Sequence, residues 1–171
     1  ILATTFDTIS SSLITSTYSV DSLGAFAYID ISSVDNAVSL GDDDYTDYLP
    51  IGFNFEYWGE TVDSFIIQSN GWISFDENTD SDFAIGLPVG DEDYDNSIFM
   101  IDVDLNPDEY GEISYATLGS TPNRIFVVDF DSVSFYGTNS LYYSAQLQLF
   151  EGTNRIEIHT ESADNNANNE N

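Results

Sequence analysis

The chain has 171 residues, with 31 acidic side chains against two basic ones, Arg124 and Arg155, and a formal net charge of −29. This charge excludes nucleic acid and anionic membranes as partners, because proteins bind both through Lys and Arg. The sequence has no lysine and no cysteine, which excludes Schiff-base chemistry, thiol nucleophiles, disulfides and thiolate zinc sites. The hydrophobic content of 42% is ample for one packed domain.

The sequence indicates an exported chain. No stretch approaches the roughly 20 consecutive apolar residues of a membrane-spanning helix, and the chain begins at Ile1 without an initiator methionine. We therefore expect a processed protein, or an excised domain, that is secreted or held at the cell surface. The absence of cysteine favours a bacterial or archaeal source over a eukaryotic extracellular module.

Three segments differ in composition. Residues 1–23 are rich in Ser and Thr, with only Asp7 and Asp21 charged, and are expected to form an N-terminal strand or a free arm. Residues 24–160 hold the β-strand pattern and are expected to form one domain. Residues 161–171 include five asparagines and no large apolar side chain, which is typical of a linker or a frayed end.

The pattern from residue 25 onward predicts short β-strands. Every second residue is apolar over 50–57, and Gln146 and Gln148 alternate with apolar residues over 144–150. No window shows a capped apolar stripe with the helical period, so the sequence predicts an all-β fold, an antiparallel, jelly-roll-like β-sandwich with very little helix. Further strands are expected at 25–31, 34–40, 62–68, 71–76, 97–103, 112–118, 124–131 and 154–160.

The acidic residues are concentrated in the middle of the chain, where 13 of the 31 lie between Asp76 and Glu112. Within this stretch, four carboxylates occupy positions 1, 3, 5 and 12 of a calcium-binding loop. They are Asp91, Asp93, Asp95 and Asp102. Asn96 stands where such loops usually carry glycine, and the flanks have strand patterns instead of helical ones. The similarity to an EF-hand is therefore limited to the ligand loop.

A second run of oxygen ligands follows directly. Asp102, Asp104 and Asn106 stand at alternate positions and offer oxygens to the same ion or to a neighbouring one. Two further clusters with ligand spacing lie at 76–82 and 41–47. Hard oxygen donors suit Ca²⁺, so the sequence predicts a calcium site formed by Asp91, Asp93, Asp95, Asp102, Asp104 and Asn106. The alternative is that these are solvated loops of a halotolerant surface protein.

Catalytic chemistry is not indicated. His159 alternates with apolar residues in a terminal strand and is interpreted as an outward-facing polar residue. With so many acids, a pair at the spacing of a glycosidase carries no information. Trp58 and Tyr57 lie at a predicted turn and are candidates for an aromatic platform that binds sugar, whereas Trp72 is expected in the core.

The order and spacing of several sequence blocks resemble the nidogen-like domain of bacterial secreted and cell-surface proteins. The blocks include Asn70-Gly71-Trp72 and Asp102-Val103-Asp104, and they lie at 50–59, 69–75, 101–107, 111–115, 122–128 and 145–157. The resemblance implies an extracellular β-sandwich module of adhesive or structural proteins, without catalysis. Arg124 and Arg155 each open a predicted strand beside an Asn, and we expect them to pair with carboxylates.

One departure from the family pattern concerns assembly. The chain turns into its Asn-rich tail at Glu161, where relatives continue with further strands, and this predicts an open sheet edge. Residues 1–23 would add to that edge within the chain, or between chains as strand donation into a filament. The predicted function is thus a calcium-binding module for adhesion or structure, with copies of itself or other surface domains as partners. The alternative is a carbohydrate-binding module that recognises a glycan.

Overall fold

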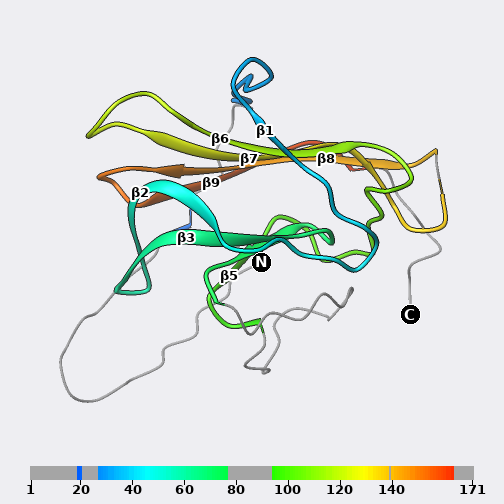
Figure 1. Ribbon diagram of the computed structural model, residues 1–171, viewed down its shortest axis with the longest axis horizontal. Helices are drawn as coiled ribbons and strands as arrows, with labels where there is room; N and C mark the ends of the chain where they lie inside the picture. The colour runs from blue at the N-terminus through cyan, green and yellow to red at the C-terminus, as the bar shows by residue number, and fades with distance from the viewer. Residues whose placement is uncertain (1–18, 21–26, 77–93, 139, 164–171) are drawn as a thin grey trace.

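The computed structural model describes residues 19–20, 27–76, 94–138 and 140–163, and shows two antiparallel sheets packed face to face (Figure 1). The larger sheet has the order β1-β6-β7-β8-β9, and the smaller has the order β2-β3-β4-β5. This confirms the predicted all-β sandwich. The strands are β1 (Asn36–Val38), β2 (Leu49–Tyr57), β3 (Glu60–Gln68), β4 (Trp72–Ser74), β5 (Ser97–Phe99), β6 (Glu112–Leu118), β7 (Ile125–Ser134), β8 (Tyr142–Phe150) and β9 (Arg155–Ala163).

The main core lies between the two sheets, where alternate residues of each strand point inward. In β2 the apolar positions of the predicted alternation are all buried. Phe65 of β3 meets Phe126 of β7 across the interface, with ring centroids 4.5 Å apart. Trp72 is fully buried, as expected. The hydrophobic alternation in the sequence thus determines which face of each strand forms the core.

The turn between β3 and β4 fixes the position of the segment that follows β5. Gly71 has φ of +94°, and a Cβ at this position would lie 2.3 Å from Cγ2 of Ile101. The Gly71 carbonyl accepts hydrogen bonds from the amides of Met100 (3.0 Å) and Ile101 (3.3 Å). Only glycine permits both this backbone conformation and so close an approach, so the turn holds 100–101 against the end of the smaller sheet.

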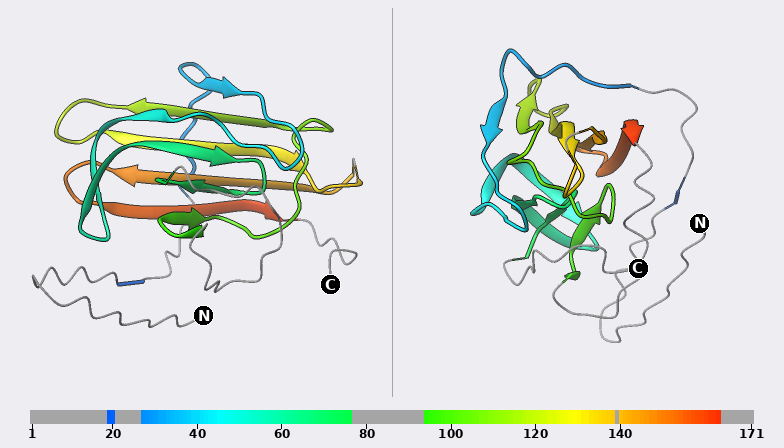
Figure 2. Two further views of the ribbon diagram at one scale, coloured as in Figure 1. Left: turned by 60° about the horizontal axis from the view of Figure 1, so that its bottom comes forward. Right: turned by 90° about the vertical axis from the view of Figure 1, so that its right-hand side faces the viewer.

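Residues 27–31, which we call the strap, form no strand, and the prediction of a strand at 25–31 is wrong for these residues. The strap crosses the outer face of the larger sheet (Figure 2) and is bound by side chains. The amide of Ile29 donates to Oε1 of Gln146 (2.9 Å), and Nε2 of Gln146 donates to the Ile29 carbonyl (3.0 Å). Gln148 donates to the Ala27 carbonyl at 2.9 Å. Side-chain amides therefore replace the main-chain ladder that a strand would need.

The strap also changes the surroundings of polar residues on the outer sheet face. The Tyr28 hydroxyl donates to Oδ1 of Asp129 at 2.5 Å, and Ile31 packs with Ala116 and Val127 in a small second core. His159, interpreted from the sequence as outward-facing, is buried. Its Nδ1 accepts from the Ala27 amide at 3.4 Å, and its Nε2 lies 2.9 Å from Glu157.

Both arginines pair with carboxylates, as predicted. Arg124 binds Glu151 through two nitrogens, at 2.8 and 2.5 Å, and also donates to the Gly52 carbonyl of the opposite sheet. Arg155 lies 3.0 Å from Glu157. The Arg124 pair holds the pKa of Glu151 down at about 2. Both basic side chains therefore take part in ion pairs within the domain.

The predicted N-terminal arm and tail fall largely outside the described residues. Residues 1–18 and 21–23 of the arm, residues 24–26 of the predicted domain, and residues 164–171 of the tail lie outside them. β9 runs to Ala163, past the predicted start of the tail at Glu161. In the part of the chain that the structure describes, no helix is long and apolar enough to cross a membrane.

Candidate metal centre

Three segments meet at the end of the smaller sheet where β3 turns into β4. The loop before β2 pairs with the end of β3, because Tyr45 and Gln68 form an isolated antiparallel bridge. The Ser69 amide donates to the Asp44 carbonyl (2.9 Å), and the Asp44 amide donates to Oγ of Ser69 (2.9 Å). These bonds place Asp42 and Asp43 next to the β3–β4 turn.

Asn70 connects this loop to the segment after β5. Its Nδ2 donates to Oδ1 of Asp43 at 2.8 Å, and its Oδ1 accepts from the Leu105 amide at 2.7 Å. Asn70 is almost completely buried, and its bond with the Leu105 amide is buried as well, so this bond is costly to break. A single side chain thus sets the distance between the loop at 41–47 and the residues around Asp104.

Asp104 is held from its other side by the chain that follows β7. Leu105 and Phe135 form an antiparallel bridge with both side chains in the core. The Asp104 carbonyl accepts from the Tyr136 amide (3.0 Å), and the Asn106 amide donates to the Ser134 carbonyl (2.8 Å). The backbone at Asp104 is therefore fixed by both sheets, and its side chain points away from the core toward the acidic loop.

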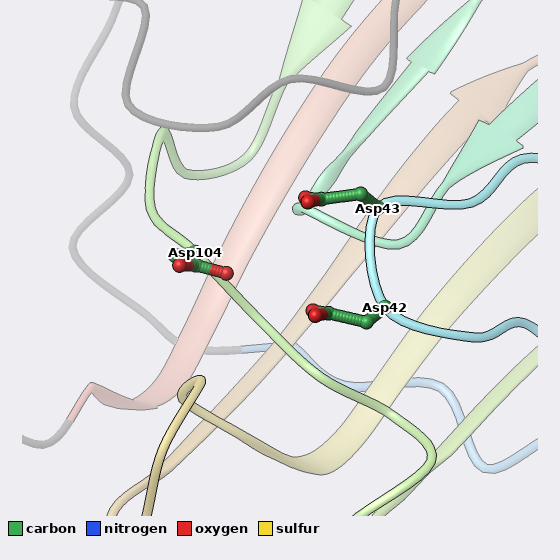
Figure 3. A group of neighbouring side chains, drawn as sticks. All are labelled: Asp42, Asp43 and Asp104. Carbon is green, nitrogen blue, oxygen red and sulfur yellow. The ribbon is translucent and has the colours of Figure 1, made fainter.

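Asp42, Asp43 and Asp104 converge on one point (Figure 3). A carboxylate oxygen from each lies within 4.8 Å of one from each of the others. Asp42 and Asp43 are exposed, whereas Asp104 is only 6% exposed. Three negative charges at this separation repel one another, and burial makes the repulsion stronger. The arrangement is unfavourable unless protons or a cation neutralise it.

The pKa values of two of these carboxyls are raised, in agreement with this repulsion. Burial, together with the nearby charges of Asp42 and Asp43, raises the pKa of Asp104 to about 6. Burial also raises the pKa of Asp42, with further contributions from Asp43, Glu109 and Asp108. Each shift shows that the charged form is disfavoured in the absence of a cation.

Asp104 also has a side-chain oxygen without a hydrogen-bond partner among the described residues. Among the described residues, buried side-chain atoms without a hydrogen-bond partner occur on Gln68, Trp72 and Asp104, and only Asp104 is ionisable. Its Oδ1 is the orphaned atom. Buried polar groups in folded proteins are nearly always paired, so this oxygen indicates a ligand. It belongs to the buried member of the acidic group.

The donor set restricts the kind of ion. All three residues offer carboxylate oxygens, and this group contains no His or Cys. Oxygen-only donors suit Ca²⁺ or Mg²⁺ and are poor ligands for zinc or copper. Calcium tolerates irregular geometry and six to eight oxygens, whereas magnesium requires a near-ideal octahedron. A site that opens to solvent on the side of Asp42 and Asp43 fits calcium better.

The predicted calcium ligands are distributed differently from the sequence pattern. Asp91 and Asp93 lie outside the described residues. Asp95 is exposed and Asp102 is half-buried, and neither belongs to the acidic group found among the described residues. Of the predicted set, Asp104 alone is in that group. Oδ1 of Asn106 accepts from the Asp108 amide at 3.0 Å within its own loop.

The acidic group combines two of the clusters seen in the sequence. Asp42 and Asp43 come from the 41–47 cluster, which has ligand spacing of its own, and Asp104 comes from the run that ends at Asn106. Spacing rules apply to ligands that are close in the chain, so they do not indicate that these two segments meet. The one local hint is the Asn70-Gly71 turn, whose amide side chain links them.

The two residues of the candidate sugar platform differ in exposure. Trp58 is 55% exposed at the β2–β3 turn. Tyr57 is buried, its hydroxyl donates to the Ser97 carbonyl (2.9 Å), and its ring packs on Phe75. Tyr57 therefore presents no open ring face, and Trp58 would act without it.

Comparison with known proteins identifies the family. The family model described as NIDO related matches residues 17–171, which include every sequence block that resembles nidogen-like domains. No curated protein and no solved structure matches the chain. The match spans both sheets and the acidic group. The chain therefore belongs to the nidogen-related family, a membership that suggests an extracellular or cell-surface domain.

Proposed function

We propose that this domain is a non-enzymatic, calcium-binding β-sandwich that acts outside the cell in adhesion or as a structural subunit. The observation that carries the calcium proposal is the orphaned Oδ1 of Asp104, which is buried beside the carboxylates of Asp42 and Asp43. A divalent cation would satisfy that oxygen and remove the repulsion among the three carboxylates.

The ion would act as a cross-link. Asp42 and Asp43 belong to the loop before β2, and Asp104 belongs to the segment after β5. Asn70 already joins these two segments by hydrogen bonds to Asp43 and Leu105. A cation bound by both would brace the end of the sandwich. A rigid end loses fewer conformations when a partner binds. This suits a module that presents a binding surface.

The direct test is a calcium titration of chelator-treated protein, followed by its melting temperature. At a free calcium concentration of about 100 times Kd, binding adds about 2.7 kcal/mol, which raises the Tm of a domain of this size by about 5–10 °C. Magnesium at the same concentration should give a smaller rise. An unchanged Tm at millimolar calcium would remove the calcium proposal.

Asp95→Asn is the matched control for the location of the site. Asp95 belongs to the loop predicted from spacing but lies outside the acidic group. If calcium binds at Asp42, Asp43 and Asp104, D95N keeps the full rise in Tm. If D95N removes the rise, the ion is bound by the 91–102 loop, and the proposed location is incorrect.

Assembly into a filament is a form of the structural proposal, in which the partners are copies of this chain or other surface domains. Its support is the sheet order, in which β9 forms an edge and pairs with β8 alone among the described strands. Deletion of residues 1–20 should abolish filaments seen by electron microscopy. Filaments formed by the deletion variant would exclude residues 1–20 as the strand donor.

Sugar binding at the β2–β3 turn is the alternative function. The exposed ring of Trp58 supports it, and the burial of Tyr57 weakens it. Trp58→Ala should abolish glycan binding if this turn is the platform. Unchanged binding in W58A would remove the alternative.

A further inference from the structure

Tyr136 lies on the same side of the chain as the Asp104 carboxylate. Leu105 and Phe135 pair as an antiparallel bridge and both point into the core. One residue along on each segment, the Tyr136 amide donates to the Asp104 carbonyl at 3.0 Å. Side chains alternate between the two faces of a paired, extended backbone, and those of directly opposite residues are neighbours. The side chains of Asp104 and Tyr136 therefore leave the core together.

The ring of Tyr136 is accessible, with an exposed fraction of 51%. Two other exposed tyrosines, Tyr45 and Tyr110, lie on the segments that would hold the ion. The Tyr110 carbonyl accepts from the Ser134 amide, and the Tyr110 ring lies 5.0 Å from that of Tyr142. Tyr45 lies within the 41–47 loop. Both chain segments that would hold the ion therefore carry an exposed tyrosine.

The described residues would leave the proposed ion open on the side of Asp42 and Asp43. Asp42 and Asp43 are exposed, and only Asp104 is buried. Calcium binds six to eight oxygens, and three carboxylates reach six only if every one of them is bidentate. One Asp43 oxygen already accepts a hydrogen bond from Asn70. Coordination positions on the solvent side would therefore be filled by water or by oxygen atoms of a ligand.

Charge selects among such ligands. Three carboxylates and one Ca²⁺ carry a charge of −1 (3 × −1 + 2), Asp108 and Glu109 add negative charge near Asp42, and the whole chain carries −29. Anionic ligands are repelled at long range. A neutral sugar with two adjacent hydroxyls can replace two waters on the ion and place the apolar side of its ring on an aromatic side chain.

We propose that the acidic end of the sandwich is a calcium-dependent binding site for neutral carbohydrates with adjacent hydroxyl groups. The ion held by Asp42, Asp43 and Asp104 binds the two hydroxyls, and the exposed ring of Tyr136 packs against the sugar. This inference rests on the calcium site of the proposed function. It places sugar recognition away from Trp58, at the other end of β3, a strand whose nine residues span about 30 Å.

The test is binding of the full chain to a glycan array that carries neutral and acidic glycans, in calcium and in EGTA. We expect binding to neutral glycans with adjacent hydroxyls, and its loss in EGTA. Tyr136→Ala should weaken this binding by about fivefold or more and leave the calcium-induced rise in Tm intact. Trp58→Ala is the matched aromatic control, similarly exposed, and should bind as the unmodified chain does.

The outcomes separate the two proposals. A rise in Tm with calcium but no binding to any neutral glycan would overturn the carbohydrate inference and leave the calcium site intact. Binding that persists in EGTA, that is lost in W58A and kept in Y136A, or that is confined to acidic glycans would overturn it as well. If calcium gives no rise in Tm, the calcium site fails and the carbohydrate site fails with it.

Discussion

Asp104, which is buried, and Asp129, which is half-buried, are two carboxyls in different parts of the sandwich. Burial is the main cause that raises the pKa of each to about 6. Asp129 lies under the strap, where the Tyr28 hydroxyl donates to it at 2.5 Å. Oδ1 of Asp104 has no partner in the described part of the chain. A raised pKa therefore reports burial in both places, and only the missing partner distinguishes a candidate ligand site.

The neighbours of the two groups reinforce this distinction. The charges of Asp131 and Glu161 also raise the pKa of Asp129, and its hydrogen bonds with Tyr28 and Gln146 oppose part of the increase. Asp104 has two further carboxylates within 4.8 Å and no compensating bond to its Oδ1. The first carboxyl belongs to a completed network, and the second belongs to one that a cation would complete.

The largest effect is expected from substituting the two carboxyls in turn. Asp104→Asn should abolish the calcium-induced rise in Tm of about 5–10 °C. D104N should also melt at a higher temperature than the metal-free parent at neutral pH, since one of three repelling charges is gone. Asp129→Asn keeps an oxygen acceptor for Tyr28 and should keep the calcium effect. Thermal melts with EGTA or calcium measure both variants, and loss of the effect in D129N would break the distinction.

The next effect is on the pH dependence of calcium affinity. The pKa of Asp104 is raised in the folded, metal-free protein, so its contribution to stability is complete below about pH 4 and is lost as the pH rises through about 6. Calcium needs the ionised form and must displace the proton below pH 6. Titration calorimetry should give a Kd about tenfold higher at pH 5 than at pH 7. An affinity that is constant over this range would contradict the role of Asp104.

A smaller effect is expected from Tyr28→Phe, which removes the hydroxyl that donates to Asp129. The loss of this bond should lower the free energy of unfolding by about 1 kcal/mol, or Tm by about 2–4 °C. The pKa of Asp129 should rise further, because that hydrogen bond lowers it. Calcium should still raise the Tm of Y28F by the full amount. A reduced calcium effect would mean that the strap and the acidic end are coupled.

The smallest effect is expected at Asp129 itself. Carboxyl carbon chemical shifts, followed from pH 3 to pH 8, report the pKa of each group. Calcium should leave the pKa of Asp129 near 6 and move that of Asp104 to well below its usual range. An equal shift at both carboxyls would indicate a general effect of charge screening and not a bound ion.

The sequence predicted the fold well because the relevant pattern is local. The alternation over 50–57 became β2 with its apolar residues buried, and that over 144–150 became β8. The outer face of β8 was less predictable. Gln146 and Gln148 have the pattern of solvent-facing residues, but both are buried under the strap. The strap is held by side-chain hydrogen bonds, so no alternation of polar and apolar residues predicts that it covers this face of the sheet.

The candidate site was predictable only in part, for a related reason. Oxygen-rich runs identify possible ligands, and Asp104 was among those predicted. The partners of Asp104 are set by the Tyr45–Gln68 bridge and by Asn70, which are contacts between segments far apart in the chain. Ligand spacing within one loop favoured Asp91 and Asp93 and contains no information about such contacts. The sequence therefore indicated the chemistry of the site and not the complete set of its ligands.

The most direct test of the calcium site is a crystal structure of the protein grown with calcium, with anomalous scattering to locate the ion. We expect an anomalous peak about 2.3–2.6 Å from one carboxylate oxygen each of Asp42, Asp43 and Asp104. Oδ1 of Asp104 should be one of the ligands. A calcium peak located elsewhere would contradict the proposed site. So would the absence of a peak at these three residues in crystals grown at saturating calcium.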